Sequence, residues 1–125
     1  MPRRRAPDER RTHGKAGEDA AALALRREGW ILLDRNARVR AGEIDLVVER
    51  RGVLGFVEVK ARRSRAAGTP EEAVDSRKAA RVAAAAEEYL ARRGLSEAPR
   101  ALLVAAVDLD PAGSPVEVRI LPLEL

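Results

Sequence analysis

The 125-residue chain has no cysteine and only one Phe, one Trp and one Tyr. The absence of cysteine excludes disulfide bonds, thiolate metal sites and cysteine nucleophiles. With so few aromatic residues, the core has to consist mainly of Ala, Val, Leu and Ile, which favours helices packed on a sheet. No apolar run approaches the roughly 18 residues that a membrane-spanning helix needs. The chain also lacks a phosphate-binding Gly loop, a dinucleotide fingerprint and a His cluster, since His13 is its one histidine.

Positive charge is concentrated at the start of the chain, and the net charge is +4. We expect residues 1–13 to form a disordered basic tail and residues 14–125 to form a single domain. A basic start followed by Ala6-Pro7-Asp8-Glu9 lacks the apolar segment of a signal peptide, so a cytoplasmic protein is expected. The net charge is compatible with a polyanionic partner without requiring one.

Arginine is the default basic residue of this chain. Of its 24 basic residues only three are lysine, at positions 15, 60 and 78. Lysine offers a compact ammonium on a flexible stem where arginine offers a wide planar fork. A lysine in this chain therefore draws attention to its position, although chance is a fair explanation for any one of the three.

The hydrophobic pattern predicts helices and strands in the order α-β-β-β-α-β-β, a small mixed sheet flanked by helices. Helices are expected over residues 17–29 and from Thr69 to about Arg93, with Asp75-Ser76 as a possible second start of the latter. Trp30 and Tyr89 are expected to be packing residues. Strands are expected over residues 30–39 (with a bulge or turn at 34–36), 42–49, 53–61, 101–109 and 116–121.

The two strongest strands meet at Arg51-Gly52, and a turn there sets their register. A two-residue loop pairs Asp45 with Glu58, Glu43 with Lys60, and Val47 with Phe56. The other face then pairs Ile44 with Val59 and Leu46 with Val57, an apolar ladder suited to packing against a helix. All the charges inside the two runs therefore fall on one face of the sheet.

Opposed carboxylates at Asp45 and Glu58 admit two interpretations. Directly opposed side chains have Cβ atoms about 4.5–5.5 Å apart, so two carboxylates repel unless a cation lies between them. Mg²⁺ takes oxygen ligands and binds through one or two carboxylates plus substrate phosphates, and Lys60 is placed to stabilise charge on a phosphate oxygen. The alternative is an ordinary solvated sheet face on which Lys60 balances the acids.

At these residues the chain resembles a known family. Asp45 followed by Glu58-Val59-Lys60 looks like the PD-(D/E)XK nuclease signature. The longer string of Gly17-Glu18, Arg35-Asn36, residues 42–45 and residues 56–60 resembles the YraN family of uncharacterised bacterial proteins, which are similar to archaeal Holliday junction resolvases. The resemblance covers roughly residues 17–109 and implies a restriction-endonuclease-like α/β core of the order α-β-β-β-α-β.

The resemblance also implies site residues. Mg²⁺ or Mn²⁺ would be held by Asp45, Glu58 and the peptide carbonyl of Val59, with Lys60 beside the attacking water. Glu18 would complete the acidic cluster; its alternative role is a first-turn acid favoured by the helix dipole. Lys78 matches a family position that faces the same cleft. Where the family tends to have Arg-Phe-Asp this chain reads Arg100-Ala101-Leu102, and neither Asp108 nor Asp110 is assigned in place of that acid.

Two functions follow as hypotheses. The first is a metal-dependent DNA phosphodiesterase acting on structured or recombining DNA, with Arg62, Arg63 and Arg65 contacting flanking phosphates. The second is a non-cleaving nucleic-acid-binding accessory protein in recombination, repair or uptake, whose binding depends strongly on salt. Either could act as a homodimer.

Overall fold

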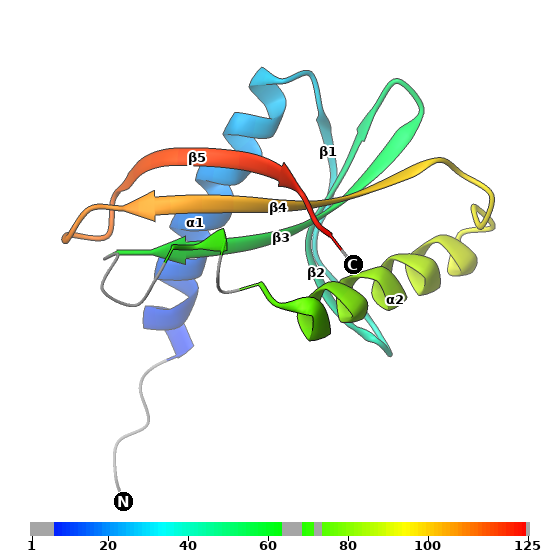
Figure 1. Ribbon diagram of the computed structural model, residues 1–125, viewed down its shortest axis with the longest axis horizontal. Helices are drawn as coiled ribbons and strands as arrows, with labels where there is room; N and C mark the ends of the chain where they lie inside the picture. Colours follow the sequence, from blue (N-terminus) through cyan, green and yellow to red (C-terminus); the bar gives the residue numbers. More distant parts are fainter. Residues whose placement is uncertain (1–6, 64–68, 72–73, 125) are drawn as a thin grey trace, which may run out of the picture.

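The computed structural model describes residues 7–63, 69–71 and 74–124, with side chains described from residue 14 onward. The expected order of elements is confirmed (Figure 1). The elements are α1 (Pro7–Arg27), β1 (Ile31–Val39), β2 (Gly42–Arg50), β3 (Val53–Arg62), α2 (Ser76–Arg92), β4 (Arg100–Leu109) and β5 (Pro115–Pro122). None of the described helices has the length and apolar character to cross a bilayer.

The five strands form one mixed sheet in the order β1-β2-β3-β4-β5. Neighbouring strands are antiparallel except for β3 and β4, which are parallel and are connected through α2. The two strands that carry the charged runs, β2 and β3, therefore lie inside the sheet, away from its edges.

The helices cover opposite faces of the sheet and divide the core into two clusters (Figure 1). Under α1, apolar helix residues such as Ala21 and Leu25 pack on Leu46, Val57 and Trp30. Under α2, the side chains include Val47, Phe56 and Tyr89, and the Phe56 and Tyr89 rings meet edge to face with centroids 5.6 Å apart. The packing roles predicted for Trp30 and Tyr89 are confirmed, since their exposed fractions are 7% and 4%.

The predicted hairpin register holds from the turn as far as Leu46. Arg51 and Gly52 both have positive φ, as a two-residue hairpin turn requires, and Leu46 pairs with Val57 and Val47 with Phe56. The ladder between the described strands β2 and β3 ends there, so the pairings predicted beyond it are wrong. Those pairings were Asp45 with Glu58, Glu43 with Lys60 and Ile44 with Val59.

The reason lies at Asp45, whose side chain bonds to the backbone of β3. Its Oδ2 accepts a hydrogen bond of 2.7 Å from the Val59 amide. Regular alternation of faces also breaks at this point, because Ile44 packs in the cluster under α2 while Leu46 and Val59 pack under α1. Strand alternation alone cannot anticipate a side chain that substitutes for a ladder partner.

Helix α1 begins earlier than predicted, and α2 begins at the second of its two predicted starts. Helix α1 starts at Pro7 and not at Gly17, so residues 7–13 of the expected tail are helical, while residues 1–6 lie outside the described residues. Pro suits a first helical position. Helix α2 begins at Ser76 with Asp75 as its cap, the later of the two starts considered, because the Asp75 carboxylate accepts from the Lys78 amide at 3.0 Å.

Candidate functional site

A polar cleft of about 260 Å³ lies between α2 and the ends of β2 and β3 that carry the charged runs. Strand β2 contributes its first residues, β3 contributes Glu58 and Lys60, and α2 contributes residues from its first two turns. The residues that line the cleft are Gly42, Glu43, Asp45, Glu58, Lys60, Lys78, Arg81 and Val82. The structure thus brings Asp45, Glu58, Lys60 and Lys78 to one cavity.

Asp45 is the most perturbed acid of the cleft. Burial raises its pKa to about 7, and the negative charge of Glu58 acts in the same direction, while the Val59 amide opposes the shift. Glu18 and Glu43 add smaller repulsions. A carboxylate held this close to other acids would be stabilised in its ionised form by a cation.

Glu58 and Lys60 form an ion pair within the cleft. The Lys60 Nζ lies 3.1 Å from Glu58 Oε1. Both side chains are largely covered, with exposed fractions of 26% for Lys60 and 16% for Glu58. Lys78 approaches from α2, and the positive charge of Lys60 is the main cause that lowers the pKa of Lys78. Two ammonium groups and the carboxylates of Glu43, Asp45 and Glu58 therefore line one cleft.

Glu18 lies near the acids but on α1, and it does not line the cleft. Its Oε1 accepts a hydrogen bond of 3.3 Å from Asn36 Nδ2. Burial raises the pKa of Glu18, and the Asn36 bond and the charge of Arg35 oppose this. Because α1 begins at Pro7, Glu18 lies well beyond the first turn of the helix. The alternative role predicted for it, a first-turn acid favoured by the helix dipole, is therefore wrong.

The arginines predicted to contact phosphates have different placements. Arg62 ends β3 and, like Arg63, is exposed; neither lines the cleft. The guanidinium of Arg63 lies against Gly113 in the β4–β5 connection. Arg65 lies outside the described residues.

Two charged lining residues were not assigned to the site from the sequence, Glu43 and Arg81. Glu43 carried a signal, because it alternates with Asp45 along β2. Arg81 also carried one, because it follows Lys78 by three residues and so shares its helix face. Choosing Arg81 from 21 arginines still required knowing which face of α2 meets the sheet.

The β1–β2 turn, which leads into the cleft, is fixed to α2 by Glu88. Its carboxylate accepts hydrogen bonds from the amides of Arg40 and Ala41 at 2.8 and 3.0 Å and pairs with Arg92 at 2.8 Å. These bonds hold Gly42 and Glu43 beside α2.

The donor atoms of the cleft suit a hard divalent cation. Asp45 and Glu58 offer carboxylate oxygens, the chemistry that Mg²⁺ and Mn²⁺ prefer. Among the described residues, however, no three His, Cys, Asp or Glu side chains converge as a preformed metal centre. The fit is therefore that of two carboxylates, completed by backbone, water or substrate oxygens.

Asp108 and Asp110 are engaged elsewhere. Asp108 accepts from Arg119 at 2.5 Å, and Asp110 accepts from the Ser114 amide at 2.8 Å in the β4–β5 turn. Leaving both acids out of the site agrees with these contacts.

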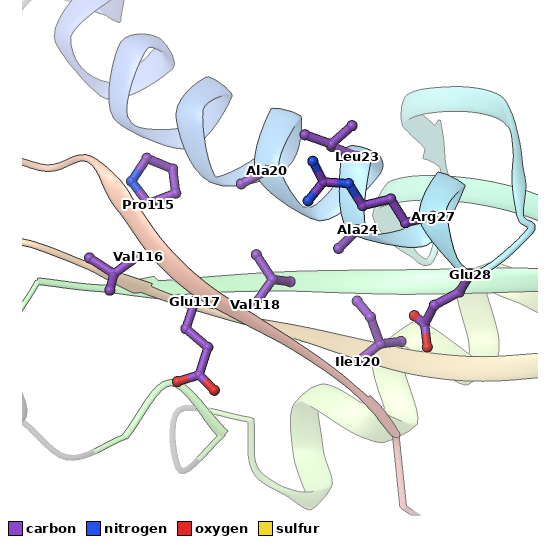
Figure 2. Close-up of a pocket in the computed structure, with 10 residues that line it drawn as sticks. All are labelled: Ala20, Leu23, Ala24, Arg27, Glu28, Pro115, Val116, Glu117, Val118 and Ile120. Carbon is purple, nitrogen blue, oxygen red and sulfur yellow. The ribbon is translucent and has the colours of Figure 1, made fainter.

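A second and larger cavity, of about 460 Å³, lies between α1 and β5 (Figure 2). Apolar side chains of α1 and β5 line it, among them Ala24, Val118 and Ile120, together with the charged residues Arg27, Glu28 and Glu117. It shares no lining residue with the polar cleft.

The fold and the cleft define a small mixed α/β protein with acids and lysines gathered at the sheet beneath its second helix. Residues 17–108 match the family described as "Uncharacterised protein family UPF0102", and the chain belongs to this family. A UPF0102 protein of Symbiobacterium thermophilum is 49% identical over 100 residues, 80% of this chain and 85% of the relative. One from an Anaeromyxobacter species is 44% identical over 105 residues, 84% of this chain and 79% of the relative. A third, from Moorella thermoacetica, is 44% identical over 101 residues, covering 81% and 84%.

Proposed function

We propose that the chain is a metal-dependent phosphodiesterase that cleaves DNA, with the cleft beneath α2 as its active site. The observation that supports this best is the shared lining of the cleft by Asp45, Glu58 and Lys60, the acids and lysine of the nuclease-like string. The raised pKa of Asp45 supports it further, because burial and the charge of Glu58 both disfavour the ionised carboxylate, and a resident cation would offset them.

Each residue has a defined task in this proposal. Asp45 and Glu58, with the Val59 carbonyl, hold Mg²⁺ or Mn²⁺, which when bound polarises the phosphate and lowers the pKa of water. Lys60 orients the water and stabilises negative charge on the phosphate oxygens. Glu18, which accepts a hydrogen bond from Asn36, adds negative charge near Asp45 and assists through the metal or the water. Lys78 contacts phosphate from α2.

The substrate proposed is DNA in a branched or otherwise structured form. The exposed arginines Arg62 and Arg63 continue β3 beyond Lys60 and supply flanking backbone contacts, and Arg65 follows them in the chain. Contacts of this kind position a phosphate backbone without reading its sequence.

One observation favours a second candidate, a nucleic-acid-binding accessory protein that does not cleave. The ammonium of Lys60 already pairs with Glu58 at 3.1 Å, and a metal ion at Glu58 has to compete with that contact. If the pair persists, the cleft binds phosphate through its basic residues on α2, Lys78 and Arg81, and does not cleave DNA.

The two candidates differ in their products. Branched and linear DNA are incubated with the protein in Mg²⁺, Mn²⁺ or EDTA, beside Asp45→Asn, Lys60→Ala and the control Glu97→Ala, which removes an exposed acid far from the cleft in sequence. Products that need metal, appear with wild type and Glu97→Ala, and vanish in the other two variants support the nuclease. Binding without products in any metal supports the accessory protein instead.

Metal binding is measured separately, without reference to cleavage. A ligand that binds only the folded state stabilises it by RT ln(1 + [L]/Kd). Millimolar Mn²⁺ is therefore expected to raise the melting temperature of the wild type and of Glu97→Ala, and to leave that of Asp45→Asn nearly unchanged. Equal shifts for all three proteins would place the cation elsewhere.

A further inference from the structure

The first turns of α2 present two basic side chains to the cleft, Lys78 and Arg81. Residues three apart on a helix lie on the same face, with Cβ atoms about 5–6 Å apart. Both residues line the cleft, opposite the acids of β2 and β3. The family resemblance accounts for Lys78 and not for Arg81.

Arg81 is held by its stem and not by its charged end. The Cγ and Cδ methylenes of Arg81 lie over Gly42, about 4 Å from the position that a Cβ would take there. The residue is exposed, and no side chain or carbonyl among the described residues pairs with its guanidinium. Arg35, Arg92 and Arg100, by contrast, are paired with carboxylates at 2.5–2.8 Å.

The α2 side of the cleft favours an anion beside Arg81. Lys78 and Arg81 bring two positive charges from one face of α2, while Lys60 on β3 is already paired with Glu58 at 3.1 Å. Two cations on one helix face attract an anion such as phosphate. A guanidinium presents a planar fork that matches phosphate oxygens two at a time, which an ammonium does not.

We propose that Arg81 binds a backbone phosphate next to the one held at Lys60 and Lys78, so that the nucleic-acid strand crosses the first turns of α2 toward the β1–β2 turn. This inference rests on the function proposed above and adds to it the path of the substrate. It assigns specificity for a phosphodiester chain to α2, in addition to the arginines that follow β3. A strand on this path passes over Gly42, beside which the Arg81 stem lies.

The test measures binding of a short fluorescein-labelled DNA duplex in EDTA, where no cleavage occurs, over a series of salt concentrations. Each phosphate contact contributes about 0.9 to the slope of log K against log salt. Arg81→Ala is expected to reduce this slope by about 0.9, and Arg81→Lys to keep it close to the wild-type value. The matched control is Arg77→Ala, which removes an exposed arginine from the same helix that does not line the cleft, and its slope is expected to match the wild type.

A slope that Arg81→Ala leaves unchanged, or that Arg77→Ala lowers equally, overturns the inference. Far-UV circular dichroism checks that each variant is folded. The cleavage assay above tests the proposed function independently. If the wild type cuts DNA but Arg81→Ala leaves the slope unchanged, the nuclease proposal is supported and the Arg81 contact is refuted. If Arg81→Ala lowers the slope but the wild type never cuts DNA, the Arg81 contact is supported and the nuclease proposal is refuted.

Discussion

At the scale of single residues, Asp45 differs from every other acid of the sheet in what surrounds it. Its carboxylate is covered, accepts a bond from the Val59 amide and faces the charge of Glu58. Asp108, which is also largely covered, instead lies against the guanidinium of Arg119 at 2.5 Å. The two carboxylates therefore have opposite electrostatic surroundings, and burial and the charge of Glu58 disfavour the anion at Asp45.

This difference predicts a pH dependence of stability in metal-free protein. The pKa of Asp45 is about 7 in the folded state and about 3.9 in the unfolded chain, so between these values the folded state binds more protons. The contribution of Asp45 to the free energy of unfolding therefore falls as pH rises through this window. Asp45→Asn lacks this loss and keeps an acceptor for the Val59 amide. In urea unfolding in EDTA, Asp45→Asn is expected to gain on the order of 2 kcal/mol over the wild type between pH 4.5 and pH 8.

The control for this prediction is Glu97→Asn, at an exposed acid. Its free energy of unfolding should follow the wild type across the same pH range. Parallel curves for wild type and Asp45→Asn would mean that Asp45 is not strained as an anion.

At the scale of elements, the sequence predicts most of the fold because its local signals are strong. Alternating apolar residues and the Arg51-Gly52 turn predict β2, β3 and their register, and Gly29 and Gly94 mark the ends of the two helices, both with positive φ. The sequence does not predict that the ladder stops at Leu46. That depends on the Asp45 carboxylate reaching the Val59 amide on another strand, a tertiary contact that no local pattern encodes.

The site divides in the same way. The nuclease-like string of motifs identifies Asp45, Glu58 and Lys60, and these residues line one cleft. Arg81 enters the cleft only because α2 packs on β2 with that face inward. Which of many arginines meets the acids depends on that packing and not on the arginine itself.

Gly55 on β3 has the closest neighbours among the described glycines. A Cβ at this position would lie 2.8 Å from Val48 Cγ2 and 3.0 Å from Trp30 Cζ3, both in the cluster under α1. Because neither neighbour is the free end of a flexible chain, Gly55→Ala is expected to lower the free energy of unfolding by about 1–3 kcal/mol. The fluorescence of Trp30, the one tryptophan, follows unfolding in urea.

Gly14→Ala is the matched control, because it makes the same chemical change on α1 where nothing lies within 4 Å of the added carbon. It is expected to leave stability unchanged or to raise it by up to about 1 kcal/mol through helix propensity. A Gly55→Ala variant as stable as Gly14→Ala would show that Trp30 can move aside without cost.

At the scale of the whole molecule, Arg119 joins segments that are distant in the sequence. Its guanidinium on β5 contacts Asp108 on β4 at 2.5 Å and Glu71, which precedes α2, at 2.6 and 2.9 Å. The hydrogen bond to Arg119 is the main cause that lowers the pKa of Glu71. The edge of the sheet is thereby tied to the segment that leads into α2, the helix that carries Lys78 and Arg81.

Removing this guanidinium should cost more than the loss of one surface ion pair. In Arg119→Met the carboxylates of Glu71 and Asp108 remain near each other without their shared cation, so repulsion is added to the lost hydrogen bonds. We expect the free energy of unfolding to fall by about 1–3 kcal/mol at pH 7.

The pKa of Glu71 is lowered in the folded state, so the stability from this contact is present above the unfolded pKa of Glu and is lost as pH falls through the folded value. The deficit of Arg119→Met against wild type should therefore shrink toward pH 3. Arg35→Met, which breaks the pair with the exposed Asp19, is the control and should lose less at pH 7 because solvent can take up that carboxylate. A deficit for Arg119→Met that is no larger than for Arg35→Met, or that does not change with pH, would show that β5 and the segment before α2 are held together by packing and not by this cluster.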